Sequence, residues 1–382
     1  MITRIGLAAA LAICLAACGG GNGSAGATSA SDPRNNSGDD SSEHIPTDPD
    51  PSGPLFGLSY PPVEEAADRQ FTLEQLAALN VDRVRFDEGW RYREPEQGFF
   101  DWGPLDQRMD WLFENGISVL LTIQSNGPDW ACDPVRLNER ACVFVDSQAF
   151  KNYIQALLQR YPNEIPLIQF GNEWLSDYWF TGNAEEFVEY TNILYSAVQE
   201  YSPQTKVVLG GLANGDLSSL AFCKGAIDSF HRDATGELIQ ASQRAALCNS
   251  EEALAARDML ETVLENAKYD VIDIHLYDDV ENWKTYLQTL RSHIGTATPV
   301  IVGEFGGPNL FWEAYSDEYQ AQRLEQYLTT LSEMAVEEAY YFKLVQSESA
   351  LESHWESGLF RMLDNLYVKK PAFDTFQQFM LQ

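Results

Sequence analysis

Basic residues are scarce in this sequence. Lysine and arginine together number 25, against 57 aspartates and glutamates. The resulting formal net charge of −32 repels nucleic acid and anionic lipid head groups, so we expect neither as a partner. Such a charge favours solubility, and it favours neutral substrates over polyanions. Histidine is rare as well, with five residues in 382, which leaves few ligands for a metal site.

The most apolar N-terminal run covers residues 5–17, and it is too short to span a bilayer as a stable helix. It follows Arg4 and is typical of an export signal. The run ends in the letters LAAC, at Cys18, which resembles the bacterial lipoprotein box. That resemblance implies a signal over residues 1–18, with Cys18 as the lipidated residue that anchors the chain to a membrane. An ordinary secretory signal with a chance cysteine is the alternative.

The residue after Cys18 is Gly19 rather than the aspartate that marks inner-membrane retention in such lipoproteins. We therefore expect an exported bacterial protein on the outer membrane or the cell surface. Residues 19–54 consist largely of Gly, Ser, Asn, Asp and Pro, which offer little apolar surface to stabilise a fold. This stretch is predicted to be a flexible tether, followed by one folded domain over residues 55–382.

Six cysteines are present, of which Cys14 would leave with the signal and Cys18 would carry lipid. An even number then remains, which indicates disulfides in an exported chain. Sequence alone does not separate the three possible connectivities. Proximity favours joining each cysteine to its nearest neighbour, and no histidine or further cysteine lies nearby at the spacing of a metal site. The four residues are Cys132, Cys142, Cys223 and Cys248.

From residue 55 onward, short apolar or β-branched runs alternate with longer segments of helical pattern. Eight strand and helix units in strict alternation predict a parallel sheet covered by helices, and eight units close into a (β/α)8 TIM barrel. A doubly wound open sheet is the alternative, but the Gly-rich phosphate loop typical of that fold is missing. Strands are expected at 55–60, 81–86, 118–123, 167–170, 206–212, 271–276, 300–304 and 339–345. Helices are expected at 73–79, 104–115, 147–160, 184–201, 251–266, 281–294, 317–334 and 373–381.

Two glutamates stand at the ends of buried apolar strands. Glu173 follows the fourth strand, and Glu304 ends the seventh. A charged group there is costly unless it is paired or used, and the carboxyl ends of barrel strands are where catalytic residues gather. Two carboxylates that face each other suit cleavage of a glycosidic bond, and they would stand roughly 5–5.5 Å apart in a retaining enzyme. A pair of purely structural glutamates is the alternative.

This arrangement resembles the clan A glycoside hydrolases, such as families 5, 39 and 42. Their signature is Asn-Glu ending strand four, here Asn172 and Glu173, and Glu ending strand seven, here Glu304. The resemblance implies that Glu173 is the acid/base and Glu304 the nucleophile of a retaining hydrolase. It also implies that Asn172 binds the sugar 2-hydroxyl. Such an enzyme needs no metal or organic cofactor, and its partner is a carbohydrate.

Three further positions agree with the resemblance. Arg85, on the second strand, matches the arginine that supports the nucleophile and would keep a carboxylate ionised. His275 and Tyr277 end the sixth strand in a His-x-Tyr pattern, where the tyrosine of related enzymes hydrogen-bonds the nucleophile. The alternatives are a structural ion pair for Arg85, a barrel-core role for His275 and an aromatic lining role for Tyr277.

Aromatic residues are frequent on the predicted catalytic-face loops, where rings stack on the C–H faces of sugars. We expect Trp90, Trp179 and Trp312 to line sugar subsites. The sequence departs from the clan at strand eight, where many members carry a tryptophan that forms the floor of the −1 subsite. Here the run is YYFKLVQ, over residues 340–346. Lys343, Gln346 or Trp355 could take that place, which leaves the sugar open.

Two other functions remain in competition with hydrolysis. A catalytically silent barrel that binds glycan at the cell surface would carry the same aromatic residues, but it would have no chemical need for both glutamates. A metal-dependent barrel enzyme could use His275, Asp273 and glutamates as ligands, but it would lack the several strand-end histidines that such sites use. The sugar, its linkage and endo or exo action are not fixed by the sequence.

Overall fold

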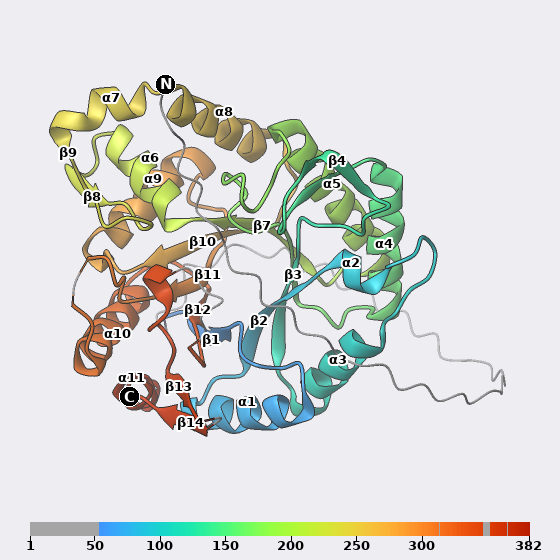
Figure 1. The fold of residues 1–382 in the computed structure, drawn as a ribbon, viewed down its shortest axis with the longest axis horizontal. Helices are drawn as coiled ribbons and strands as arrows, with labels where there is room; N and C mark the ends of the chain where they lie inside the picture. The colour runs from blue at the N-terminus through green and yellow to red at the C-terminus, as the bar shows by residue number, and fades with distance from the viewer. Residues whose placement is uncertain (1–52, 313, 347–351, 365) are drawn as a thin grey trace, which may run out of the picture. The chain divides into compact units, whose positions relative to one another are not determined.

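The computed structural model describes residues 53–312, 314–346, 352–364 and 366–382. The predicted signal, Cys18 and residues 19–52 of the tether lie outside these residues. Eight parallel strands form a closed barrel, and the helices surround it (Figure 1). The predicted (β/α)8 fold is therefore confirmed. Strand β1 closes the ring by pairing with β12, so that Gly57 lies opposite Tyr340.

The barrel strands lie close to the predicted positions, because each is a short apolar run between polar segments. The order around the ring is β1, β12, β11, β10, β7, β6, β3 and β2. In chain order the bounds are β1 Leu55–Ser59, β2 Arg83–Glu88, β3 Ser118–Ile123, β6 Leu167–Phe170, β7 Lys206–Leu212, β10 Val271–Tyr277, β11 Val300–Gly306 and β12 Glu338–Phe342.

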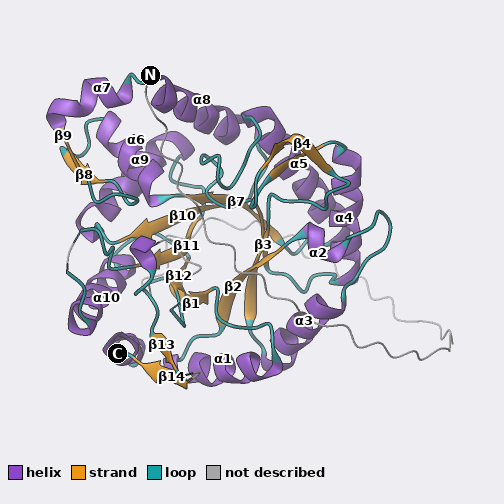
Figure 2. Ribbon diagram, viewed as in Figure 1, coloured by secondary structure: helices purple, strands orange, loops and turns teal. Residues whose placement is uncertain are grey.

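All eight predicted helices are present in the outer layer, which Figure 2 shows around the strands. The first begins at Ala66, seven residues earlier than predicted, because its first two turns are polar and give little apolar signal. The helices are α1 Ala66–Leu79, α3 Gly103–Asn115, α4 Ser147–Arg160, α5 Ala184–Tyr201, α8 Glu251–Asn266, α9 Trp283–Ile294, α10 Asp317–Ser332 and α11 Pro371–Met380.

Several short elements within the loops were not predicted. Three are two-stranded antiparallel hairpins, and three are short helices. Their runs are too brief to establish a period in the sequence. They are β4 Cys132–Leu137 with β5 Cys142–Phe144, β8 Ser229–His231 with β9 Leu238–Gln240, β13 Phe360–Leu363 with β14 Leu366–Lys369, and the helices α2 Trp90–Arg93, α6 Asn214–Cys223 and α7 Arg244–Cys248.

The barrel has two buried layers, one inside the ring of strands and one between the strands and the helices. The inner layer is closed by large apolar side chains, so the barrel is packed rather than an open pore. Its residues are Leu120, Leu167, Val208, Val271, Ile301 and Tyr340. Among the helices of the described residues, none combines the length and the apolar character that crossing a bilayer requires.

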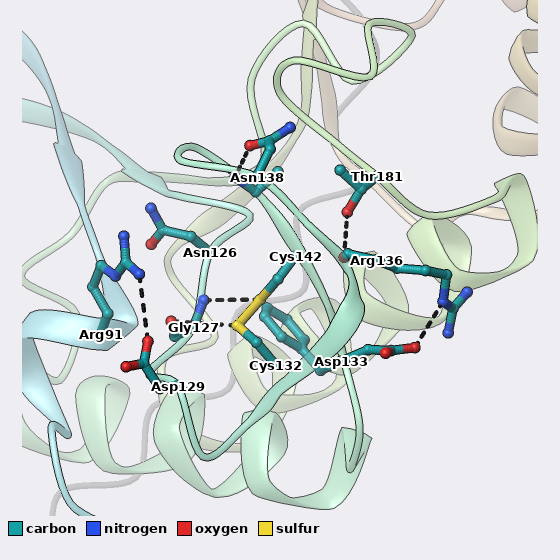
Figure 3. Close-up of a disulfide and its surroundings, with 12 residues drawn as sticks. Arg91, Asn126, Gly127, Asp129, Cys132, Asp133, Arg136, Asn138, Cys142 and Thr181 are labelled. Atoms are coloured by element: carbon teal, nitrogen blue, oxygen red, sulfur yellow. Dashed lines mark hydrogen bonds and ion pairs between the residues drawn. A yellow bond between two sulfur atoms is a disulfide. The ribbon is translucent and has the colours of Figure 1, made fainter. Parts of the chain in front are cut away.

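Both disulfides join the cysteines that lie nearest in sequence, which confirms the pairing favoured by proximity. Cys132 and Cys142 clamp the β4–β5 hairpin with an S–S distance of 2.03 Å. The backbone N–H of Gly127 donates to Cys142 Sγ at 3.3 Å (Figure 3). The second disulfide, Cys223–Cys248, closes a segment that contains the β8–β9 hairpin. Each cross-link limits the freedom of a loop that follows a barrel strand.

Candidate active site

Glu304 lies at the carboxyl end of β11 and is 6% exposed. Arg85 of β2 donates from Nη1 to Glu304 Oε1 at 2.5 Å, and the hydroxyl of Tyr277 donates to Oε2. Burial alone would raise the pKa of Glu304. The positive charges of His275 and Arg85 and the hydrogen bond from Tyr277 more than offset burial, and they hold the pKa below its usual value. Glu304 is therefore an ionised carboxylate with a fixed orientation.

Glu173 stands directly after β6, where the chain turns sharply. Gly171 has a φ of +74°, and Glu173 itself has a φ of 42°. A left-handed backbone at a non-glycine residue is costly, and such residues gather at functional sites. The turn directs the Glu173 side chain toward β10, where His275 Nδ1 lies 2.8 Å from Oε1. The other oxygen accepts a hydrogen bond from Trp179 Nε1 at 3.0 Å.

The two carboxylates share one small space at the end of the barrel. A carboxylate oxygen of Glu173, a ring nitrogen of His275 and a carboxylate oxygen of Glu304 all lie within 4.8 Å of one another. Asn172 lies beside them, because its Oδ1 accepts a hydrogen bond from Arg85 Nη2 at 2.7 Å. Arg85 therefore orients both the residue predicted to be the nucleophile and the residue predicted to bind the sugar.

His275 is fully buried between three carboxylates. Its Nδ1 meets Glu173, and its Nε2 lies 3.3 Å from Asp273 Oδ2 in an ion pair. Burial lowers the pKa of His275, but the charges of Glu304 and Asp273 outweigh it and raise the pKa to about 10. The imidazole is therefore protonated at neutral pH, and it donates to Glu173. Gly211 makes room for the ring, since a Cβ there would lie 2.3 Å from Nε2.

Trp179 is held over the site by the clamped β4–β5 hairpin. Asn138 Nδ2 donates to the carbonyl of Asp177 at 2.7 Å. Thr181 Oγ1 donates to the carbonyl of Arg136 at 2.9 Å (Figure 3). The guanidinium of Arg140 lies 5.5 Å from the centre of the Trp179 ring. These contacts tie the loop after β6 to the hairpin after β3, and so they fix the indole that binds Glu173.

Trp90 does not lie at the site surface, contrary to the sequence prediction. Its side chain is fully buried, and its Nε1 donates to Glu94 Oε2 at 2.6 Å. The ring packs in an aromatic cluster and is stacked on Tyr153 at a centroid distance of 5.6 Å. A fully buried indole offers no surface to a sugar, so Trp90 does not line a sugar subsite. Its position at the N-terminus of α2, close to a strand end, gave no sign of this burial.

Trp312 remains available to a ligand. It lies in the loop after β11, is half-buried, and its ring lies 4.9 Å from that of His231 in β8. The Trp312 Nε1 atom is buried without a hydrogen-bond partner. Trp312 packs against His231 of the β8–β9 hairpin, whereas Trp179 hydrogen-bonds Glu173. The two tryptophans therefore have different neighbours.

The end of strand eight carries an aromatic residue that the sequence prediction missed. Phe342 is the last residue of β12, and its ring lies 5.9 Å from Tyr60 and 6.0 Å from Tyr277. Lys343 is buried beside it, and burial lowers the pKa of its amine to about 8. Trp355 is more exposed, at 39%. Phe342 lies within the YYFKLVQ run, but the sequence prediction considered only Lys343, Gln346 and Trp355 for this place.

Two more side chains near the strand ends were missed. Asp87 of β2 accepts hydrogen bonds from the Tyr60 hydroxyl at 2.6 Å and from Gln124 Nε2 at 3.1 Å. It shares a small cavity with Asn172 and Trp179. His354, from the loop after β12, stacks on the Tyr277 ring at 4.2 Å, and burial lowers its pKa to about 4. Asp87 could have been found from its place two residues after Arg85, whereas the loop gave no signal for His354.

Glu173, His275 and Glu304 are also the set of described residues that could offer three ligand atoms to a metal ion. Each is already engaged in this arrangement. Both oxygens of Glu304 accept hydrogen bonds, and the protonated ring of His275 has no lone pair to donate. The donor set therefore fits an acid/base site better than a metal site.

A family model described as the glycosyl hydrolase catalytic core matches residues 246–367, which include His275, Tyr277 and Glu304. This segment is less than half of the chain. No curated protein matches the sequence.

Solved structures with the same fold include several glycoside hydrolases. One is a family 39 glycoside hydrolase from Bacteroides cellulosilyticus WH2, with 15% identity and a TM-score of 0.59, covering 86% of this chain and 64% of that one. A second is an exo-β-1,4-mannosidase from an Opitutaceae bacterium, strain TAV5, at 16% and 0.56, covering 86% and 59%. A third is a GH5_18 protein from Streptomyces cattleya in complex with GlcNAc, at 15% and 0.62, covering 86% and 80%.

This chain therefore spans about 60% of the length of the first two of these proteins. At such identities the likeness establishes the barrel fold. The family match adds a likeness to a glycosyl hydrolase catalytic core over residues 246–367.

Proposed function

We propose that this protein is a retaining glycoside hydrolase that cleaves β-linked glycosidic bonds by double displacement. The observation that carries the proposal is the closeness of the two carboxylates: one oxygen of Glu173 and one oxygen of Glu304 lie within 4.8 Å of each other. Retaining enzymes place these groups about 5–5.5 Å apart, whereas inverting enzymes leave about 6.5–9.5 Å for a water molecule. The short approach of these oxygens therefore supports retention rather than inversion.

In the first step, the Glu304 carboxylate attacks the anomeric carbon. The bond from that carbon to the leaving oxygen breaks, and Glu173 donates its proton to this oxygen. Arg85 and Tyr277 keep Glu304 ionised and aimed. The product of this step is a glycosyl ester on Glu304, together with a free alcohol.

In the second step, Glu173 is a carboxylate and accepts a proton from water. The oxygen of that water attacks the anomeric carbon, and the ester bond to Glu304 breaks. The sugar is released with its original anomeric configuration. His275 and Trp179 each donate to a Glu173 oxygen, and these two contacts hold the carboxylate in a fixed orientation for this step.

The sugar that is attacked would contact the residues around Glu304. Asn172, oriented by Arg85, would bind the 2-hydroxyl. Phe342 would form the apolar floor, in place of a strand-eight tryptophan, and Asp87 would accept hydrogen bonds from other hydroxyls. Arg85 is already paired, and Lys343 Nζ lies 5.3 Å from the centre of the Phe342 ring. The hydroxyl acceptors at this position are carboxylates, which would repel an anionic sugar, so a neutral sugar fits best.

The test is hydrolysis of aryl β-mannosides, β-glucosides and β-xylosides by the mature domain and by Glu173→Ala and Glu304→Ala variants. We expect one substrate to be cleaved, with loss of activity in both variants. Azide should restore turnover of an activated aryl substrate by Glu173→Ala and yield a β-glycosyl azide, because a small anion can replace water on the freed face. An α-glycosyl azide or an inverted product would contradict double displacement.

A glycan-binding barrel without activity is the second candidate. The aromatic residues Trp179, Trp312 and Phe342 would serve it equally well. Binding alone, however, gives no reason to hold Glu304 ionised beside Glu173 at the cost of burying the Glu304 carboxylate. Tight binding of a β-glycan without cleavage of any substrate in the panel would favour this candidate.

We also propose that Cys18 is lipidated and anchors the protein to the outer membrane or the cell surface, with residues 19–54 as a tether. The LAAC run at residues 15–18 motivates this proposal. Membrane fractionation of the full chain and of a Cys18→Ala variant tests it. Equal distribution of the two proteins between membrane and soluble fractions would contradict a lipid anchor.

A further inference from the structure

The segment closed by Cys223 and Cys248 is an insertion between a barrel strand and its helix. It follows β7 and carries the β8–β9 hairpin. In the barrel, β7 lies next to β6, the strand that precedes Glu173. The hairpin therefore lies on the acid/base side of the site, away from Phe342 and Asp87.

Asn309 joins this hairpin to the loop after β11. It is fully buried, and its backbone N–H donates to Asp278 Oδ2 at 3.0 Å. Its side-chain Nδ2 donates to the carbonyl of Asp233 at 2.9 Å. Its own carbonyl accepts the backbone N–H of Trp312 at 3.2 Å. One buried residue thus sets the distance between Asp233 of the hairpin and Trp312 of the loop.

The Asp233 carboxylate is also connected to the catalytic strand. Both of its oxygens lie 3.2 Å from Asn214 Nδ2, and Asn214 Oδ1 accepts the backbone N–H of Tyr277 at 3.2 Å. Burial raises the pKa of Asp233 to about 7, and the charge of Glu173 adds to this effect. Glu173 also contributes to the raised pKa of Asp216, which lies beneath the hairpin at the start of α6.

Trp312 supplies an aromatic ring in the loop that Asn309 ties to Asp233. The ring lies 4.9 Å from that of His231, and its buried Nε1 has no hydrogen-bond partner. The two segments approach closely at Gly236, where a Cβ would lie 2.5 Å from the carbonyl oxygen of Phe311. An aromatic ring and an acidic acceptor on neighbouring segments are the groups that proteins use for sugars, because the ring covers C–H groups and the carboxylate accepts hydroxyls.

We propose that Asp233 and Trp312 form the subsite that binds a neutral sugar on the leaving-group side of the scissile bond. This inference rests on the proposed function, in which Glu173 protonates the leaving oxygen and so faces the leaving group. The substrate class is then a β-linked oligosaccharide with a second sugar beyond the bond, rather than a glycoside of a small alcohol. Asp233 accepts hydroxyl hydrogen bonds from that sugar, and Trp312 stacks on its ring.

The experiment compares a 4-nitrophenyl β-glycoside with a β-linked disaccharide of the same glycone, chosen by the aryl panel. Asp233→Asn and Trp312→Ala should lower kcat/KM for the disaccharide roughly 10- to 100-fold more than for the aryl glycoside, since only the disaccharide loses a hydrogen bond or a stacked ring. Asp228→Asn is the matched control, because Asp228 lies in the same insertion with its side chain 93% exposed. It should leave both substrates unaffected.

Equal losses on both substrates in the Asp233 and Trp312 variants would overturn the subsite, because such losses indicate a general disturbance of the catalytic strand. Unchanged values in both variants would overturn it as well. Failure of the parent enzyme to cleave any aryl glycoside or disaccharide would instead count against the proposed function. Thermal unfolding of each variant separates loss of folding from loss of binding.

Discussion

The substitution Arg85→Met is expected to lower activity, because it removes the hydrogen bond and the positive charge that Arg85 provides to Glu304 while leaving Glu304 in place. Besides a long hydrogen bond to Ser59 Oγ at 3.4 Å, Arg85 makes two short ones, at 2.5 Å to Glu304 and at 2.7 Å to Asn172. A hydrogen bond to a charged group contributes about 1.5–3 kcal/mol, so the two together contribute about 3–6 kcal/mol. If this stabilisation is expressed in the transition state, kcat/KM should fall roughly 10²- to 10⁴-fold, at about 1.4 kcal/mol for each factor of ten.

The same change should move the acidic limb of the pH profile of kcat/KM. The charge of Arg85 helps to hold the pKa of Glu304 below its usual value, and burial opposes it. Without that charge the pKa of Glu304 rises, although His275 and the hydrogen bond from Tyr277 continue to oppose burial. The proposed mechanism requires the ionised carboxylate, so the pH at which activity is lost on acidification should move upward.

Arg83→Met is the matched control, because Arg83 lies on the same strand at the opposite end of the barrel. It is buried and paired at 2.8 Å with Glu338, and both residues stand at the first position of their strands, whereas Glu304 lies near the end of β11. Its loss should lower the unfolding temperature but leave the pH profile in place. An Arg85→Met profile with an unmoved acidic limb would refute the argument that Arg85 sets the ionisation of Glu304.

Three further substitutions test other parts of the site. Gly211→Ala should lower kcat with little change in KM, because a Cβ at 2.3 Å displaces His275 from the acid/base; an unchanged kcat would mean that the ring can shift freely. Phe342→Ala should raise KM about 10-fold or more by removing the apolar floor, measured by initial rates on the best aryl glycoside. Trp90→Phe should lower the unfolding temperature and leave KM unaltered, because the indole is buried; a raised KM would restore it as a subsite residue.

The sequence predicted the barrel well, because its signals are local and repeated. Each strand is a short apolar run and each helix a longer amphipathic one, and eight repeats leave few other folds. Three disulfide connectivities were open in the sequence, and the one favoured by proximity, which includes Cys132–Cys142, is the one observed. Glu173 and Glu304 were identifiable because a charge at the end of an apolar strand is conspicuous in a sequence.

What escaped prediction depends on where side chains point after the loops fold. Trp90 and Trp179 both follow strands by a few residues, yet one is enclosed by other rings and the other binds Glu173. Asp233 lies in a polar hairpin whose sequence has no periodic apolar pattern. Its position is fixed by hydrogen bonds from Asn214 and Asn309, which are distant in sequence. Such contacts join residues up to 76 positions apart, and no window of sequence contains both partners.

The charges around Glu304 bear on its proposed role as the nucleophile. In a chain with 57 acidic and 25 basic residues, a buried cation is a distinctive feature, and two of them, Arg85 and the protonated His275, stand at the end of the barrel. Arg85 is paired with Glu304 and His275 with Asp273, so a positive charge offsets each of these two carboxylates. In the proposed double displacement, positive charge that develops on the sugar would meet a carboxylate already in place, with no further reorganisation. Burial lowers the pKa of Lys343 to about 8, so this amine still carries most of its charge at neutral pH, and it interacts with Glu304 as a third cation.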